Sequence, residues 1–242
     1  MNAAERYLET AASAIDRLRA QHEPIERAAQ LLATSIGHGG VLHVTGSGHS
    51  QLVALELAVR AGGLAAVQAI ADPALGPGAG SLGAHLERLP GYAPAVLEAS
   101  DCQPGEVLVI VSNSGINPVP VELAREGRER GLHVVAVTSL AHAGRVASRH
   151  PDGHRLHELA EVVIDTGAPA GDTALEVAGI GIGPLSTQLG IAVLHAMACR
   201  VVEVLAAQGH AAPVLTSQNL EHGPDVNAPL LARYRDRGRW TR

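Results

Sequence analysis

Three short stretches of the 242-residue sequence are rich in hydroxyl or amide side chains, and two of them also contain glycine, a composition suited to an anion or to sugar hydroxyls. They are residues 46–50 (GSGHS), 112–118 (SNSGINP) and 186–188 (STQ). Each enters a segment with helical spacing, so backbone N–H groups and the positive end of a helix dipole would face the bound group. Each alone is also the pattern of a turn with a serine cap. Two such loops after buried strands of one sheet favour a cleft for a sugar phosphate.

One carboxylate and one imidazole lie at a distance along the chain from these stretches that would place them near a ligand bound there. Glu56 lies six residues after Ser50, about 9 Å along a helix, and Arg60 follows Glu56 at the i,i+4 spacing. His195 lies eight residues after Thr187 in an otherwise apolar helical run. Aldose–ketose isomerisation through an enediol needs one base for the C2 proton and one acid for the hydroxyl protons. The alternatives are an ion pair on a helix surface and a histidine of the core.

Composition excludes several other chemistries. All 18 basic residues are Arg, so no lysine Schiff base, Walker A lysine or kinase lysine exists. The first loop has Gln51 where a dinucleotide-binding GxGxxG pattern has its third glycine, and the nearest acidic residue after the second strand is Asp72, which argues against a nicotinamide cofactor. A net charge of −6 and 2% aromatic residues argue against a nucleic-acid partner.

The hydrophobic periodicity alternates between helices and short buried strands. Helices are expected at 3–19, 24–36, 51–61, 118–130 and 186–208, with a short one near 227–237, and strands at 41–46, 65–70, 106–112, 133–139 and 161–167. This order predicts an α/β fold with a doubly wound, five-stranded parallel sheet. We expect one domain over 1–242, made of N-terminal helices (3–36), a sheet core (41–208) and a tail (209–242). Ligands of such sheets bind at the carboxyl ends of the strands.

Three histidines are spaced like metal ligands: His150, His154 and His157. Pro151 and Gly153 break any helix that would bring them to one face, so we expect a solvated loop and no metal site.

The start of the chain has no apolar signal segment, and no stretch reaches about 18 uncharged apolar residues. We therefore expect a cytoplasmic protein with no membrane partner. Cys199 lies in an apolar helical run and is expected to be a core thiol.

Four segments together resemble the SIS (sugar isomerase) domain family, and more narrowly its uncharacterised phosphoheptose-isomerase-like branch. They are VTGSGHSQLVALELAVRAGG, IVSNSGINPVPVELA, SRHPDGHRLHELAEVVIDTGAPAGDTALE and GPLSTQLGIAVLHAM. The resemblance runs from about residue 5 to 235. It implies a flavodoxin-like strand order, a homodimer or homotetramer, and a small-molecule sugar phosphate as ligand.

The resemblance also implies roles for individual residues. The loop residues that would bind the phosphosugar are Ser47, Ser50, Ser112, Asn113, Ser114 and Thr187, to which we add His49, Arg60 and Gln188 as further candidate ligand contacts. Glu56 matches the catalytic glutamate of an E-L-x-x-R motif, and His195 matches a catalytic histidine at similar spacing on the same helix. The zinc-binding histidine of that design corresponds here to Leu52, so we expect no zinc and no cofactor.

Three functions stay open at this point. The first is an isomerase that uses Glu56 and His195. The others are a non-catalytic sugar-phosphate sensor, and a phosphosugar lyase or etherase that uses the same cleft. The polar tail at 217–227 is either a surface loop or a cover for the cleft of its own or a neighbouring subunit.

Overall fold

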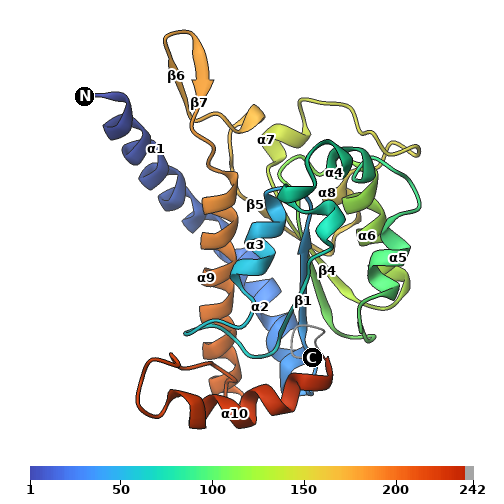
Figure 1. Ribbon diagram of the computed structural model, residues 1–242, viewed down its shortest axis with the longest axis vertical. Coiled ribbons are helices and arrows are strands. Elements are labelled where there is room, and N and C mark those ends of the chain that lie inside the picture. Colours follow the sequence, from blue (N-terminus) through green and yellow to red (C-terminus); the bar gives the residue numbers. More distant parts are fainter. Residues whose placement is uncertain (238–242) are drawn as a thin grey trace.

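The structure, a computed structural model, describes residues 1–237 (Figure 1). Its centre is a five-stranded, all-parallel sheet with the order β2-β1-β3-β4-β5. The strands are β1 (Leu42–Gly46), β2 (Val67–Ile70), β3 (Val107–Val111), β4 (His133–Thr138) and β5 (Val162–Asp165). The three inner strands are almost fully buried apolar runs, as expected for a parallel sheet with both faces covered. The expected α/β fold and flavodoxin-like strand order are confirmed.

Helices cover both faces of the sheet and form two hydrophobic clusters with it. One cluster includes side chains of α1 (Ala3–Arg17), α2 (His22–Gly37), α3 (Ser50–Glu56) and α9 (Ser186–Ala207). The other includes side chains of α4 (Gly80–Leu86), α5 (Ala93–Glu98), α6 (Pro118–Glu129) and α8 (Leu156–Leu159). The short α7 (Leu140–Ala143) follows β4. The loops after the neighbouring strands β1 and β3 therefore lead to helices on opposite faces, which opens a cleft between these loops.

The helix after β1 is shorter than its sequence pattern predicts. It ends at Glu56, whereas the sequence periodicity predicts a helix that continues to about residue 61. Val59 adopts a φ of 37°, outside the helical region, and Gly62 N donates to Leu215 O at 2.7 Å. The chain thus leaves the helix to pair with the C-terminal segment, a tertiary contact that local periodicity does not encode.

The sequence pattern also does not predict the hairpin of β6 (Leu175–Val177) and β7 (Ile180–Ile182). Its turn uses positive φ angles at Ala178 and Gly179, and its three-residue strands are too short for an alternation signal. The hairpin and the first turns of α1 project from the same end of the molecule (Figure 1).

The C-terminal tail lies at the opposite end of the molecule from this hairpin (Figure 1). Its helix α10 (Gly223–Tyr234) is followed by a 3₁₀ turn, and Arg237 binds Glu106 at 2.6 Å, just before β3 begins. Up to Arg237, the tail of this chain therefore packs at the amino ends of the strands and does not cover its own carboxyl-end loops.

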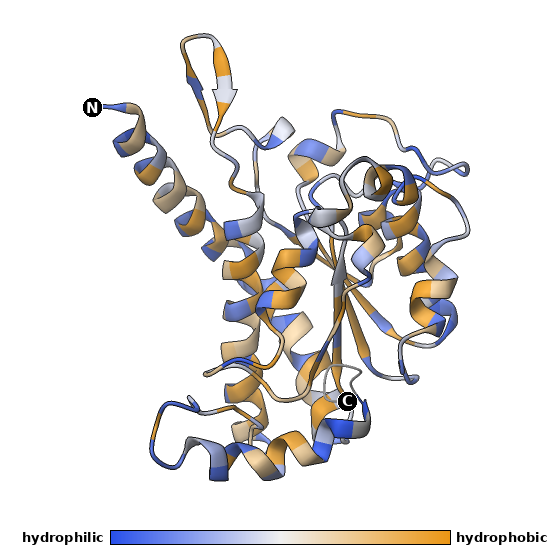
Figure 2. Cartoon of the chain, viewed as in Figure 1, coloured by the Kyte–Doolittle hydropathy of each residue, from blue (hydrophilic) through white to orange (hydrophobic). Residues whose placement is uncertain are grey.

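The long helix α9 differs from the expectation that no segment is apolar enough to cross a membrane. Its 22 residues reach that length and composition, and 44% of the apolar window is buried within the protein. In Figure 2 it is coloured mostly in hydrophobic shades along its length. Its buried side chains pack mainly against α2 and α3.

Candidate functional site

The loop after β1 is compact and tied to the neighbouring segments. A Cβ at Gly46 would lie 2.7 Å from the Ser50 backbone, so the turn requires glycine there. Gly48 N donates to Leu75 O at 2.7 Å. The Ser47 hydroxyl donates to Glu87 Oε1 at 2.8 Å. His49 is exposed immediately before α3. The loop thus offers polar groups to the cleft, and a carboxylate stands beside them.

The loop after β3 folds around a left-handed glycine. Gly115 has a φ of +60°, and its N–H donates to the Ser112 hydroxyl at 3.1 Å. Asn113 O accepts from Ser139 N at 3.1 Å, and its side-chain oxygen is buried with no hydrogen-bond partner in the structure. Ser114 is half-buried. This loop leads directly into the 12-residue helix α6, whose N-cap is Asn117.

The two loops lie at the carboxyl ends of adjacent strands. β1 and β3 pair in register up to Gly46 and Val111, so Ser47 and Ser112 follow from the same edge of the sheet. The helices that they enter lie on opposite faces. This is the topological switch point, where α/β sheets bind ligands.

Glu56, Arg60 and His195 meet between α3 and α9. His195 Nε2 lies 3.5 Å from Glu56 Oε1, and Arg60 forms an ion pair with the same carboxylate oxygen. The Glu56 and His195 side chains are 36% and 37% exposed, so a solute reaches both. The packing of α3 against α9 therefore brings together the carboxylate and imidazole that the sequence analysis selected, at the far end of α3 from Ser50.

Burial, and secondly the positive charge of Arg60, lower the pKa of His195 below its ordinary value. Because Arg60 already compensates the charge of Glu56, the nearby carboxylate does not hold His195 in its protonated form. The lowered pKa favours the neutral imidazole at pH 7, and a neutral ring donates from one nitrogen and accepts at the other.

The first turn of α9 has its own internal partners. Asp172 accepts from Leu185 N, Ser186 N and the Ser186 hydroxyl at 2.9, 2.8 and 2.6 Å. The Gln188 amide and the Tyr7 hydroxyl hydrogen-bond at 2.8 Å. Thr187 is half-buried, and its side chain has no hydrogen bond within the described residues. The Asp172 carboxylate therefore caps the amino end of α9, where the third polar stretch (residues 186–188) lies.

Two residues that the sequence analysis did not select contact the polar loops. Glu87, at the end of α4, binds Ser47 and accepts from Val119 N at 3.1 Å through its carbonyl oxygen. Arg149 donates from Nη1 to Asn117 Oδ1 at 2.9 Å. The sequence around neither residue indicates this contact, because each reaches the loops from a distant part of the chain. The only hint was that Arg149 belongs to the SRH stretch of the family resemblance.

The sequence pattern predicted a solvated loop for the three histidines His150, His154 and His157. That prediction is wrong for one of them. His150 is buried, with 6% of its surface exposed, and its Nδ1 accepts from Asp152 N at 3.2 Å. Within residues 1–237, no three His, Cys, Asp or Glu side chains are grouped so as to hold a metal ion.

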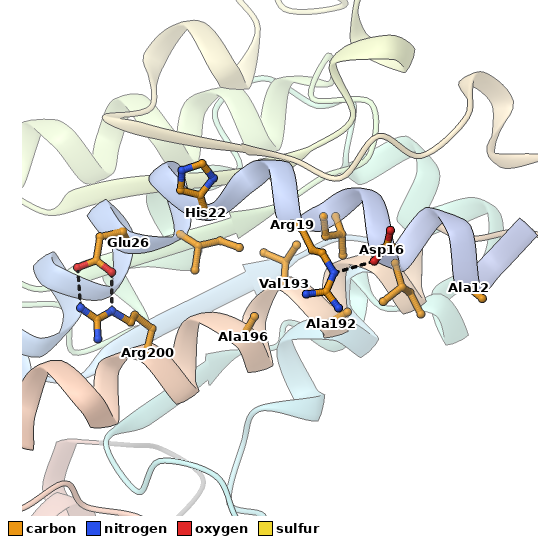
Figure 3. Close-up of a pocket in the computed structure, with 12 residues that line it drawn as sticks. Ala12, Asp16, Arg19, His22, Glu26, Ala192, Val193, Ala196 and Arg200 are labelled. Atoms are coloured by element: carbon orange, nitrogen blue, oxygen red, sulfur yellow. Dashed lines mark hydrogen bonds and ion pairs between the residues drawn. The ribbon is translucent and has the colours of Figure 1, made fainter.

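A large groove lies elsewhere, between α1, the start of α2 and α9 (Figure 3). It holds about 760 Å³ and is mainly apolar, with the ion pairs Arg19–Asp16 and Arg200–Glu26 along it. None of the polar loop residues at the strand ends lines it. Its chemistry suits a protein surface better than a sugar phosphate.

The sequence profile of the SIS domain family matches residues 6–139, more than half of the chain. The chain belongs to the SIS domain family. The UPF0309 protein of Brucella anthropi is 40% identical over 240 residues, covering 96% of each chain. A UPF0309 protein of Brucella canis is 40% identical over 225 residues, covering 92% of this chain and 90% of the relative. The SIS protein described here therefore also belongs with the UPF0309 proteins.

Solved structures share its fold at low sequence identity. The phosphoheptose isomerase GmhA from Neisseria gonorrhoeae superimposes with a TM-score of 0.56 at 20% identity, covering 83% of this chain and 96% of that one. A phosphoheptose isomerase from Francisella tularensis gives 0.55 at 15% identity, covering 84% and 100%. The sugar isomerase domain of an RpiR transcription factor from Sphaerobacter thermophilus gives 0.51 at 16%, covering 96% and 97%.

Proposed function

We propose that this SIS protein is a sugar-phosphate isomerase that interconverts an aldose phosphate and a ketose phosphate through an enediol. The observation that carries the proposal is the pair of Glu56 and His195, with 3.5 Å between carboxylate oxygen and imidazole nitrogen. Both side chains are half-exposed, and Glu56 is the last residue of α3, the helix that follows the loop after β1. The fold it shares with two phosphoheptose isomerases supports the same class of ligand.

The two side chains divide the chemistry between them. The Glu56 carboxylate takes the proton from C2 of the aldose, and that electron pair forms the C1=C2 bond of the enediol. His195 gives a proton to O1 and then removes the proton from O2, while Glu56 returns its proton to C1. The lowered pKa of His195 keeps the ring neutral, so it acts first as donor and then as acceptor. The positive charge of Arg60 stabilises the negative charge that develops on oxygen.

The remaining polar residues suit the two ends of such a substrate. A phosphate bound beside Ser50 would lie about 9 Å from Glu56, the rise of six helical residues along α3. That distance spans a sugar chain from phosphate to carbonyl. Ser47, His49, Thr187 and Gln188 would contact the hydroxyl groups between them.

The proposal is tested by incubating the protein with pentose, hexose and heptose phosphates and resolving products by chromatography. We expect turnover of at least one pair and a loss of about 10²-fold or more in Glu56→Gln and in His195→Gln. Glu176→Gln, on the exposed hairpin, is the matched control and should retain activity. Tight binding of a phosphosugar with no conversion would replace the isomerase by the sensor alternative.

A further inference from the structure

We propose that the cavity between β2 and α5 is a second ligand site, which takes a small, neutral, mainly apolar molecule with an amide or lactam edge. The cavity holds about 370 Å³, within the range of small-molecule sites. Neither Glu56 nor His195 lines it, and it shares no lining residue with the apolar groove beside α9. The inference therefore does not depend on the proposed function.

A buried side-chain amide without hydrogen bonds carries this inference. Gln68 of β2 lines the cavity and has 4% of its surface exposed. Its Oε1 is buried without a partner, and its side chain makes no hydrogen bond within the described residues. Burying an amide in this way is unfavourable, because the group loses its hydrogen bonds to water and gains none in return. A ligand that supplies those bonds would remove the penalty.

The polar side chains near Gln68 bind other groups. His43, its register partner on β1, binds Glu106 Oε2 through Nε2 at 2.7 Å, and its Nδ1 has no hydrogen-bond partner. The Ser100 hydroxyl, which also lines the cavity, donates to Val96 O at 2.9 Å. Among the described residues, the protein therefore leaves the Gln68 amide to a bound molecule. An amide or lactam edge matches it, since it offers one acceptor and one donor.

The charges of the lining favour a neutral ligand. No arginine or histidine is among the described residues that line the cavity, so an anion such as a sugar phosphate would meet no positive side chain. The one carboxylate of the lining, Asp72, already accepts from Ala74 N at 2.8 Å and from the Tyr92 hydroxyl at 2.5 Å. Two hydrogen bonds from the protein thus satisfy this carboxylate without a cation.

The rest of the wall is apolar and made largely of small side chains. Ala95 and Ala99 follow each other at the i,i+4 spacing at α5, and Ile70, Ala71 and Pro73 come from β2 and the segment after it. The two alanines at α5 are exposed, and their short side chains leave the cavity open to solvent. A bicyclic aromatic lactam combines an apolar body with the amide edge that Gln68 lacks.

The test uses 2-quinolone, a neutral bicyclic lactam, and coumarin, which has the same shape but a ring oxygen in place of the N–H. Each would be titrated into the isotope-labelled full-length protein and followed by amide NMR shifts. We expect 2-quinolone to shift signals within residues 68–73 and 92–100 and to bind about fivefold more tightly than coumarin. Gln68→Leu keeps the site apolar and should lose this preference.

Two alanine variants localise the binding. Ala95→Trp places a large ring over the cavity from an exposed position and should abolish 2-quinolone binding. Ala84→Trp, at an exposed position of α4 that does not line the cavity, is the matched control and should bind normally. Absence of 2-quinolone binding, an equal preference over coumarin in Gln68→Leu, or unchanged binding in Ala95→Trp would each overturn the inference.

One further variant distinguishes a separate ligand from a side chain of the protein. The single tryptophan of the chain, Trp240, lies outside the described residues and carries an N–H donor on an aromatic bicycle. Equal affinity for 2-quinolone in the unaltered protein and in Trp240→Ala supports a site for a separate molecule. Binding that is detected only in Trp240→Ala would overturn it, because the chain's own indole would then be the occupant.

Discussion

At the residue scale, Arg60 sets the charge state of the two side chains assigned to the chemistry. It pairs with Glu56 and lowers the pKa of His195 by its positive charge, in addition to the larger effect of burial. Removing it leaves an uncompensated carboxylate 3.5 Å from the imidazole, which favours the protonated ring.

Arg60→Gln should therefore raise the pKa of His195, so that the ring protonates at a higher pH than in the unaltered protein. The measurement is a proton NMR titration of the imidazole, with the His195 signal assigned by its loss in His195→Gln. Arg200→Gln, whose guanidinium binds Glu26 in the groove, should leave the titration unchanged. An unchanged or lower pKa in Arg60→Gln would show that the guanidinium does not act on this ring.

Glu56, Arg60 and His195 were selected from their residue types, their spacing from the polar loops and the resemblance to the SIS family. Glu56 and His195 lie on helices whose starts were predictable, whereas Arg60 lies beyond the end of α3. Glu87 and Arg149 escaped notice because they reach the cleft through contacts distant in sequence. The prediction that Cys199 is a core thiol is wrong, because the residue is exposed although its helix is apolar. Apolar neighbours along a helix do not identify which of its faces is buried.

At the scale of elements, the amino end of α9 depends on a residue far outside the helix. Asp172 receives three hydrogen bonds from Leu185 and Ser186, which satisfy N–H groups that a helix leaves unpaired. It also adopts a φ of 55°, a left-handed conformation that Asp and Asn tolerate better than most side chains.

Asp172→Ala should lower the free energy of unfolding by about 1–2 kcal/mol, because the cap is lost and alanine is less favourable at this φ. Asp172→Asn keeps an acceptor oxygen and the conformational tolerance, so its loss should be clearly smaller. Urea denaturation followed by circular dichroism measures both. Equal losses in the two variants would mean that the charge, and not the cap, stabilises the helix.

Periodicity predicted the strands and most helices because both faces of the sheet are covered and most of the buried strand side chains are apolar. It missed the hairpin, whose turn depends on positive φ angles, and extended α3 too far, because the chain after α3 pairs with the tail. The element order was therefore more predictable than the element ends.

At the scale of the whole molecule, a large apolar surface remains uncovered in the single chain. Less than half of the apolar window of α9 is buried, and the groove beside it is mainly apolar (Figure 3). Exposed apolar side chains continue this surface onto α1 and the hairpin: Leu8, Ile15, Ile180 and Ile182. The charged pairs along the groove contain both signs, which suits a self-complementary contact. We propose that a second copy of the chain covers this surface in a homodimer or homotetramer.

Ala196→Arg places a long charged side chain in the groove and should weaken self-association at least tenfold. Ala206→Arg, at an exposed position of the same helix outside the groove, is the control and should associate normally. Sedimentation velocity over a concentration series measures both. A monomer at all concentrations in the unaltered protein, or an intact oligomer in Ala196→Arg, would contradict this assignment of the surface.

Proton exchange from solvent tests the isomerase account most directly, because the aldose passes its C2 proton to a protein base as the enediol forms. The protein would be incubated in D₂O with the aldose and ketose phosphates, and deuterium at C2 followed by NMR. The account predicts that at least one sugar phosphate incorporates deuterium at C2 and that Glu56→Gln abolishes the incorporation while still binding the ligand. Deuterium incorporation that persists in Glu56→Gln, or no incorporation into any sugar phosphate that the protein binds, would contradict it.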